Sequence, residues 1–317
     1  MNNIHLTPSQ IEQANNLTWY HALDFGDYQT IGRLKPPLQP NCTLFGVMDL
    51  LSSVNINGMK CLDVGTAHGV ISLGMAILGG TVSATDIGEG TSRQIRLASD
   101  IYGVNIDYHS PVYLEHVQNN FEYGTFDLIV CAGVMYHLFN PADVFTRLRP
   151  LLKRDGLLVV ESACALKETR PTFVLNSETG DYVEPTTYFL PSPSAMTGLA
   201  KLCCLDVLAT RTCSPGRFTL IGRATLPEEV MGRTPQCKKI HEFGVSDPVL
   251  NIRSFTDAER SLIKYSGDTG QKFIDRNSYK PDWPSHPTVP KTPLGKAAAG
   301  EALKALVQAE SAGRINR

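Results

Sequence analysis

The sequence predicts an α/β fold, with a doubly wound, Rossmann-like sheet of seven strands that ends in an antiparallel hairpin. Two patterns lead to this prediction. Between residues 60 and 162, short apolar runs alternate with segments of helical character, which is typical of parallel strands joined by crossover helices. Further on, two apolar runs flank Cys213-Ser214-Pro215-Gly216, a hairpin turn signal. The expected strands are 61–64, 81–85, 105–109, 126–131, 157–162, 205–211 and 218–224.

Helix positions follow from capping patterns and from proline. Thr7-Pro8-Ser9-Gln10 and Thr256-Asp257-Ala258-Glu259 are capping boxes that each open a helix. The expected helices are 8–17, 41–51, 70–78, 91–102 with Thr91 as its cap, 141–153, 194–204, 256–265 and 296–312. Residues 165–191 are expected to be irregular, and the five prolines of 277–293 exclude a regular helix or a central strand.

The chain divides into three expected parts. Residues 1–40 form an N-terminal helical cap with a substrate segment, 41–225 form the core, and 226–317 form a C-terminal extension. The extension allows two interpretations, a lid strap over the ligand site or an arm that packs against a partner subunit in a homodimer. Tyr279 and Trp283 supply aromatic anchors for either.

Composition limits the partners and the compartment. The formal net charge of −2 argues against a protein held on nucleic acid by bulk charge. No apolar run reaches the roughly 20 residues of a membrane-spanning helix, and the N-terminal MNNIHLTPSQ lacks the apolar stretch of a signal peptide. The eight cysteines form no C-x-x-C pair, so we expect reduced thiols, no bound metal and a cytoplasmic location.

The stretch Lys60–Glu89 has the layout of a nucleoside-binding unit: strand, glycine-bearing turn, helix, strand and acid. Glycines in the turn Gly65-Thr66-Ala67-His68-Gly69 let a ligand approach the backbone, and the following helix offers free N–H groups. Asp86, about 20 residues further on, is placed to accept both hydroxyls of a ribose. The turn lacks the G-x-G-x-x-G of a dinucleotide site, which disfavours that ligand.

Four stretches resemble class I S-adenosylmethionine-dependent methyltransferases. LDVGTAHG is similar to the first motif of that family, TDIG to its ribose-binding acid, FDLIVCAGVMYHLFNP to its fourth-strand region and LKRDGLLVVES to its fifth-strand region. The resemblance covers residues 17–224 and implies an enzyme with S-adenosyl-L-methionine as cofactor. WYHALDFGD, GVMYHL and YFLPSPSAMTGLAKLCCLDVL are similar to the branch of wobble-uridine tRNA methyltransferase-like and carboxymethyltransferase-like proteins.

The chain departs from the family pattern in three places. Ala67 replaces the usual middle glycine of the loop, which puts a Cβ where the backbone normally lies closest to the cofactor. The tryptophan-rich segment of the carboxymethyl branch is absent before the first strand, so carboxymethyl transfer is less expected. Residues 226–317 resemble no known part of the family.

The resemblance implies a cofactor-binding set along the strand ends. Asp63 would bind the methionyl ammonium, directly or through water, although helix capping would also explain an aspartate there. Asp86 would hold the ribose, Gly133 would face the sulfonium, and Ser110 and Val112 would flank the adenine. The full expected set is Asp63, Gly65, Thr66, Gly69, Asp86, Ile87, Ser110 and Gly133.

The methyl acceptor is expected to meet residues 19–27, 133–137 and 161–170. Methylation of oxygen or nitrogen can use a general base, for which histidine is well suited near pH 7, whereas a thioether needs none. The expected catalytic residues are His21, Asp24, Tyr136 and His137, and the expected substrate-binding residues are Tyr20, Asp27, Glu161 and Arg170. Structural alternatives stay open: a His21 bond to a backbone carbonyl, His137 as a cap of the sheet edge, and Arg170 as a solvated loop charge.

Two functions follow. The leading one is methyl transfer to a small polar or amino-acid-like metabolite at oxygen, nitrogen or sulfur, including a methionine-type thioether. The alternative is methylation of a tRNA wobble uridine, which needs basic residues on one face beside aromatic side chains. The local basic candidates are Arg147, Arg149, Lys153 and Arg154, which we expect instead to form the solvated face of a helix. A non-catalytic cofactor-binding protein would not need this set of motifs.

Overall fold

The computed structural model describes residues 4–34, 39–176, 186–213, 216–225 and 256–286. The predicted helix at 296–312 and the last part of the proline-rich segment lie outside these residues. Among the described helices, none combines the length and the apolar character that a membrane crossing requires.

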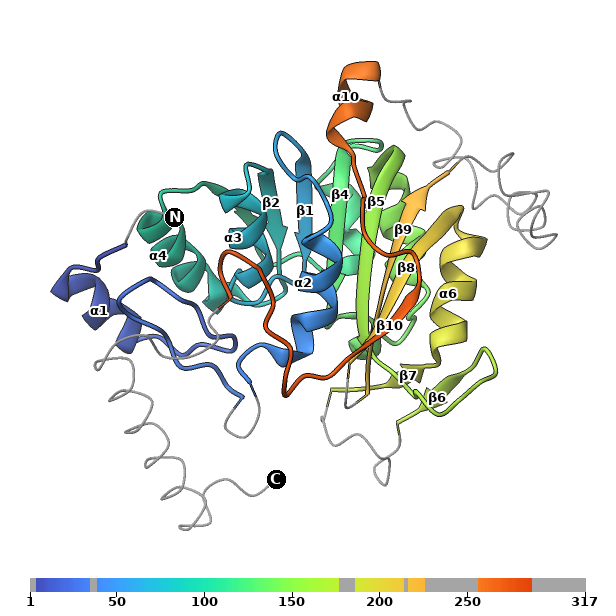
Figure 1. The fold of residues 1–317 in the computed structure, drawn as a ribbon, viewed down its shortest axis with the longest axis horizontal. Helices are drawn as coiled ribbons and strands as arrows, with labels where there is room; N and C mark the ends of the chain where they lie inside the picture. Colours follow the sequence, from blue (N-terminus) through green and yellow to red (C-terminus); the bar gives the residue numbers. More distant parts are fainter. Residues whose placement is uncertain (1–3, 35–38, 177–185, 214–215, 226–255, 287–317) are drawn as a thin grey trace, which may run out of the picture.

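One mixed sheet forms the centre of the molecule, with eight strands in the order β10-β8-β9-β5-β4-β1-β2-β3 (Figure 1). The strands are β1 Lys60–Val64, β2 Thr81–Thr85, β3 Ile106–His109, β4 Phe126–Ala132, β5 Leu152–Ala163, β8 Leu205–Cys213, β9 Arg217–Ala224 and β10 Gln271–Ile274. All neighbours pair in parallel except β9, which is antiparallel to both β5 and β8. The predicted α/β fold with its antiparallel terminal hairpin is therefore confirmed.

Three short strands were not predicted. β10 adds to the sheet edge, parallel to β8, so the sheet has eight strands rather than seven. β6 (Phe173–Leu175) and β7 (Phe189–Pro191) form a separate antiparallel pair inside the segment expected to be irregular. These strands have only three or four residues, too few for an alternating pattern to show in the sequence.

Helices cover both faces of the sheet (Figure 1). The α-helices are α1 Pro8–Asn15, α2 Phe45–Leu51, α3 Val70–Ile77, α4 Ser92–Tyr102, α5 Asp143–Leu148, α6 Pro193–Leu202 and α10 Asp257–Leu262. The 3-10 turns are η1 Cys42–Leu44, η2 Glu89–Thr91, η3 Leu114–Asn119, η4 Met135–His137 and η5 Arg149–Leu151. Cys61 and Leu128 pack in one core with α2, α3 and α4, whereas Leu62 and Ile129 pack in the other with α5 and α6. Burial on both sides explains why the central strands are continuous apolar runs.

The helix predicted for 141–153 is shorter than expected. The helix α5 ends at Leu148, η5 follows, and β5 already begins at Leu152. Pro150 lacks the N–H that a continued helix would need at this point.

Two of the three predicted helix caps are confirmed. Thr7 exchanges bonds with Gln10, and Thr256 exchanges bonds with Glu259. Thr91 makes no side-chain cap, because its hydroxyl donates to the Gly88 carbonyl oxygen instead.

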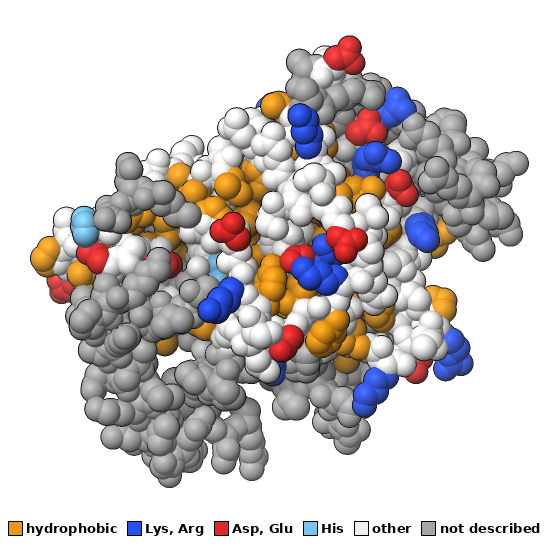
Figure 2. Space-filling model, viewed as in Figure 1, with side chains coloured by type: hydrophobic (Ala, Val, Ile, Leu, Met, Phe, Trp, Pro, Cys, Tyr) orange, Lys and Arg blue, Asp and Glu red, His pale blue; other side chains and the backbone are white. Residues whose placement is uncertain are grey.

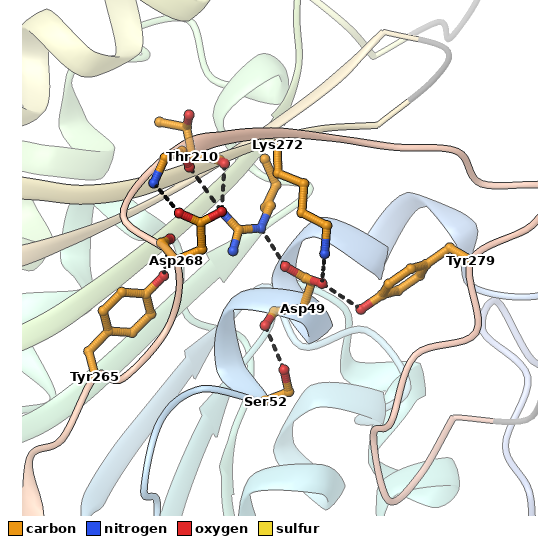
Figure 3. Close-up of polar contacts among 9 residues, drawn as sticks. Asp49, Ser52, Thr210, Tyr265, Asp268, Lys272 and Tyr279 are labelled. Atoms are coloured by element: carbon orange, nitrogen blue, oxygen red, sulfur yellow. Dashed lines mark hydrogen bonds and ion pairs between the residues drawn. The ribbon is translucent and has the colours of Figure 1, made fainter.

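The C-terminal extension is fastened to the core at a largely buried acidic side chain (Figure 3). Asp49 of α2 contacts Nε of Arg211 on β8, and its Oδ1 accepts bonds from Lys272 Nζ and from the Tyr279 hydroxyl, both at 3.0 Å. Burial alone would raise the pKa of Asp49, but the bonds from these three side chains outweigh it and hold the pKa below its ordinary value. Asp49 thus joins α2, β8, β10 and the segment that follows β10.

Residues 275–286, here called the C-terminal strap, run from β10 to the first turn of α3. Ser285 Oγ donates to the Val70 carbonyl at 2.7 Å, and Trp283 Nε1 donates to the same oxygen at 3.5 Å. The Trp283 ring lies against Gly74, where a Cβ would come within 2.0 Å of Nε1. The strap therefore ends beside the glycine loop, where the cofactor was predicted to bind.

Candidate active site

Asp63, at the end of β1, fixes the glycine loop. Its Oδ2 accepts bonds from Thr66 Oγ1 at 2.8 Å and from Ser72 Oγ at 2.6 Å. Burial raises the pKa of Asp63 to about 6, and the bonds from Ser72 and Thr66 limit the rise. These contacts are with side-chain hydroxyls, and both helix capping by Asp63 and a contact with a methionyl ammonium stay predictions.

The loop backbone is left-handed at three positions: Gly65 (φ +73°), Ala67 (φ +49°) and Gly69 (φ +84°). Glycine adopts this conformation freely, whereas the Cβ of Ala67 makes it unfavourable by about 1–2 kcal/mol. The Ala67 N–H donates to Asp86 Oδ2 at 2.8 Å, which holds the loop in this shape. A Cβ on Gly65 would come within 2.3 Å of the Val134 side chain, so a larger residue there would displace Val134.

Asp86, directly after β2, is the residue predicted to hold the ribose. Its Oδ1 accepts the Gly88 N–H at 2.9 Å, and each carboxylate oxygen can accept a second bond. Its backbone carbonyl accepts the Val112 N–H at 2.9 Å, which places the 110–112 turn beside it. Ile87 is 63% exposed, and Ser110 Oγ is buried without a hydrogen-bond partner among the described residues. These groups fit a nucleoside, and their individual roles stay predictions.

The end of β4 meets a buried ion pair. Glu161 Oε1 lies 2.5 Å from Arg217 Nε, and Oε2 lies 2.8 Å from Nη2. The Gly133 N–H also donates to Oε2, at 2.9 Å. The Arg217 guanidinium lies 5.0 Å from the centre of the Tyr136 ring, and a Cβ on Gly133 would lie 3.8 Å from the Tyr136 hydroxyl. The predicted sulfonium position, the phenol and the ion pair are therefore neighbours.

This arrangement changes the role expected for Glu161. Because its carboxylate binds Arg217 and Gly133, it holds Arg217 in place rather than meeting a charged group of the substrate. Sequence reasoning missed Arg217, which lies 56 residues from Glu161 and reaches it only because β9 pairs antiparallel with β5. No pattern in the sequence marks that pairing of side chains.

The N-terminal segment reaches the site through His68, a second residue that was not predicted. The Tyr20 N–H donates to His68 Nδ1, so the neutral ring carries its proton on Nε2. Burial lowers the pKa of His68, and Asp86 opposes this shift. His68 is therefore neutral at pH 7 and ties residue 20 to the glycine loop.

His21 is the most deeply buried of the predicted catalytic histidines. It is 9% exposed, and its Nδ1 has no hydrogen-bond partner within the described chain. Burial lowers the pKa of His21 to about 3, and electrostatic interactions with His68, Arg217 and His286 act in the same direction. A ring that stays neutral at pH 7 can accept a proton or a hydrogen bond. The carbonyl contact considered as an alternative is not made by Nδ1.

The two predicted aspartates of the N-terminal segment bind backbone or side chains of that segment. Asp24 Oδ1 accepts the Gly26 N–H at 3.0 Å. Asp27 contacts the His5 ring at 3.1 Å and the Leu6 N–H at 3.4 Å. Both aspartates therefore have a structural explanation, and their roles toward a substrate stay predictions.

The remaining acceptor candidates lie nearer the surface. His137 Nδ1 bonds the Thr186 carbonyl at 2.9 Å, and Tyr20 is 38% exposed. The Arg170 side chain is 81% exposed and pairs with Glu168 at 3.8 Å, which matches the alternative of a solvated loop charge. The acceptor site proposed below does not depend on these three residues.

Comparison with known proteins gives a match to one family model. Residues 41–178 match the family described as methyltransferase domain. This part of the chain is therefore similar to a methyltransferase domain. Its class I fold agrees with the sheet order described above, and the cofactor of this domain is S-adenosylmethionine.

Two relatives of this chain are named ubiquinone biosynthesis O-methyltransferases and not tRNA-modifying enzymes. A ubiquinone biosynthesis O-methyltransferase of Marinobacter nauticus is 27% identical over 154 residues, which are 49% of this chain and 64% of that protein. One of Azotobacter vinelandii is 34% identical over 103 residues, 32% of this chain and 44% of that protein. The chain thus spans less than two thirds of the length of either. The finer resemblance to the wobble-uridine branch is not supported.

A solved structure of an S-adenosylmethionine-dependent methyltransferase from Mesorhizobium loti superposes with a TM-score of 0.46. It shares 13% identity and covers 55% of this chain and 95% of its own.

Proposed function

We propose that this chain is an S-adenosylmethionine-dependent methyltransferase that modifies a hydroxyl oxygen of a small molecule. One observation carries the proposal: His21 is buried and Arg217, whose charge helps to lower the pKa of His21, is joined to Gly133 through Glu161. This link supports a site that combines a candidate base with the predicted methyl position. Of the oxygen, nitrogen and sulfur acceptors expected from the sequence, oxygen is favoured because the relatives are named O-methyltransferases.

The described residues support a simple division of labour. S-adenosylmethionine supplies, when bound, an electrophilic methyl group on a sulfonium. The glycine loop and Asp86 bind the nucleoside end, and Gly133 leaves the approach to the methyl open because it has no side chain. His21 accepts the proton of the acceptor hydroxyl at a ring nitrogen. Methyl transfer is an in-line displacement, so positioning and desolvation supply most of the rate.

The alternative of an RNA substrate is weakened because part of the basic surface that it requires is buried. Arg149 is fully buried and donates to the Cys204 and Thr225 carbonyls, and Lys153 is buried against Asp127 at 2.7 Å. The expectation that both lie on a solvated helix face was wrong. On the face shown in Figure 2, lysine and arginine side chains are scattered, several of them next to acidic ones, without forming a continuous basic stripe. A small-molecule acceptor therefore has the better support.

The test is methyl transfer from labelled S-adenosylmethionine into a cell extract that is then divided into small molecules and RNA. We expect label in the small-molecule fraction, in a product that alkali does not release as methanol, since an ether forms. Label confined to RNA would contradict the proposal. The Asp86→Ala protein serves as the control for cofactor-dependent transfer.

Two further predictions stay part of this proposal. The seven cysteines of the described residues are free thiols, which is compatible with a cytoplasmic location. A homodimer also stays a prediction, and mass determination of the purified chain in solution would test it.

A further inference from the structure

The last described residue of the C-terminal strap, His286, is buried without a polar partner. His286 is 6% exposed, and neither nitrogen of its ring has a hydrogen-bond partner in the part of the chain that the structure describes. The ring packs edge-on against Phe45, with 5.1 Å between ring centres. An aliphatic or aromatic residue would fill this place at lower cost, so the two nitrogens call for an explanation.

His286 shares its surroundings with His21, which comes from the opposite end of the chain. The backbone of Ala22 is tied to the Asn41 side chain by bonds of 2.9 Å and 2.7 Å. Phe45, about one helical turn after Asn41, contacts the His286 ring. His21 and His286 therefore flank the same turn, and a positive charge on His286 is close enough to affect His21.

Both histidines are held in place by the cofactor-binding part of the fold. The segment of His21 is tied to the glycine loop through the bond from Tyr20 to His68. The strap is tied to the first turn of α3 by Ser285, 2.7 Å from the Val70 carbonyl, and at its other end by Asp49 (Figure 3). Two segments from distant parts of the sequence thus bring imidazole rings to one place beside the cofactor loop.

The chemistry of this place favours an uncharged ligand with oxygen atoms. Three buried ring nitrogens, one of His21 and two of His286, lack hydrogen-bond partners among the described residues, and an unsatisfied buried polar group is unfavourable. A neutral imidazole offers one donor and one acceptor, so a hydroxyl group can satisfy it. The nearby cation Arg217 is already neutralised by Glu161, so no net positive charge favours a carboxylate here.

We propose that the C-terminal strap completes the acceptor site, with His286 and His21 binding an uncharged oxygen-bearing group of the acceptor. This inference rests on the proposed function, since it assigns the substrate class of the same site. It also chooses between the two interpretations of the extension, because residues 275–286 serve as a lid strap on their own chain. The strap supplies a binding residue that the methyltransferase domain at 41–178 lacks.

The test measures binding of catechol, an uncharged diol, and of benzoate, a carboxylate of similar size, to the S-adenosylhomocysteine-loaded full chain. We expect catechol to bind at least tenfold more tightly than benzoate. His286→Phe keeps the ring volume and removes both nitrogens, so it should weaken catechol binding at least tenfold. Binding of S-adenosylhomocysteine to the same variant should change less than twofold.

His116→Phe is the matched control, because His116 is exposed on η3. It should leave catechol affinity unchanged. The ¹⁵N shifts of the His286 ring, assigned from their loss in His286→Phe, should move when catechol is added to the wild-type chain. His286→Gln, which keeps a donor and an acceptor, should retain part of the affinity if the effect is polar rather than a folding defect.

Three results would overturn the inference: no catechol binding by the wild-type chain, equal or tighter binding of benzoate, or unchanged catechol affinity in His286→Phe. Failure of the wild-type chain to bind S-adenosylhomocysteine would count against the proposed function instead. The two failures are thus distinguishable in one set of titrations.

Discussion

The cofactor side and the acceptor side of this site are built in different ways. On the predicted cofactor side, the side chains of Asp63 and Asp86 bond to groups of the same βαβ unit that lie at most 19 residues away from them. On the proposed acceptor side, the key groups come from residues 21, 217 and 286, and three ring nitrogens of residues 21 and 286 have no partner in the described chain. A local, satisfied site suits a fixed cofactor, whereas an assembled site with unsatisfied atoms suits a varying substrate.

The largest expected effect comes from breaking the buried ion pair between Glu161 and Arg217 on the proposed acceptor side. Glu161→Ala leaves the Arg217 charge buried without its carboxylate, so the free energy of unfolding should fall by about 3–5 kcal/mol, measured with urea. The double variant Glu161→Leu/Arg217→Met should recover most of the loss. Glu168→Ala breaks an exposed pair and should change stability by less than about 0.5 kcal/mol. Equal losses in Glu161→Ala and Glu168→Ala would show that the buried pair is not special.

The pH dependence of the free energy of unfolding tests whether His286 is neutral in the folded chain. Burial lowers the pKa of His286 to about 4, below the ordinary 6.5 that holds in the unfolded chain. The unfolded chain then binds more protons as the pH falls, so stability contributed by neutral His286 is present above pH 6.5 and is lost toward pH 4. The wild type should lose on the order of 2 kcal/mol more than His286→Phe between about pH 7.5 and pH 4.5.

Urea unfolding of both proteins at the two pH values measures this difference. Asp63 has a raised pKa and contributes in the opposite direction, with stability lost as the pH rises through about 6, but it is common to both proteins and cancels. The same slope in the wild type and in His286→Phe would mean that the pKa of His286 is not lowered in the folded chain.

A smaller effect is expected at the cofactor side. Asp86→Ala should weaken S-adenosylmethionine binding by more than tenfold, about 1.4 kcal/mol, because it removes the acceptors for the ribose and the anchor of the loop. Calorimetric titration measures the affinity. Asp107→Ala, which removes an exposed acid that bonds only its neighbour His109 in the described contacts, should have no effect. Unchanged affinity in Asp86→Ala would refute the ribose role.

The smallest expected effect is at Ala67. Ala67→Gly relieves a left-handed Cβ but makes the unfolded chain more flexible, so the net gain in stability should be about 0.5 kcal/mol. Ala98→Gly, in the middle of α4, should instead lose about 1 kcal/mol. Thermal unfolding of Ala67→Gly and Ala98→Gly measures whether each variant gains or loses stability. A loss at both positions would show that the loop holds no strain at Ala67.

The contrast between local and long-range contacts also explains which features could be predicted from the sequence. Strands β1 and β2 and the glycine loop were located to within a residue, because apolar runs, glycines and an acid at fixed spacing are local signals. Arg217, His286 and β10 were missed because each gains its role from a partner far away in the chain. Arg149 shows the limit in the other direction: a charged residue in a helix pattern is normally solvated, and only the structure shows carbonyls from other segments around it.

The two sets of contacts that hold the C-terminal strap also have a consequence for the order in which the chain folds. Lys272 and Asp49 are 223 residues apart, and Ser285 and Val70 are 215 apart. Contacts of such long range form late, because the entropy of closing a long loop must be overcome before they contribute. We expect a folding chain to reach the cofactor loop first and the acceptor site last. During synthesis, we therefore expect the cofactor loop to form while residue 286 is still inside the ribosome. The proposed acceptor site would be completed only after that residue has emerged.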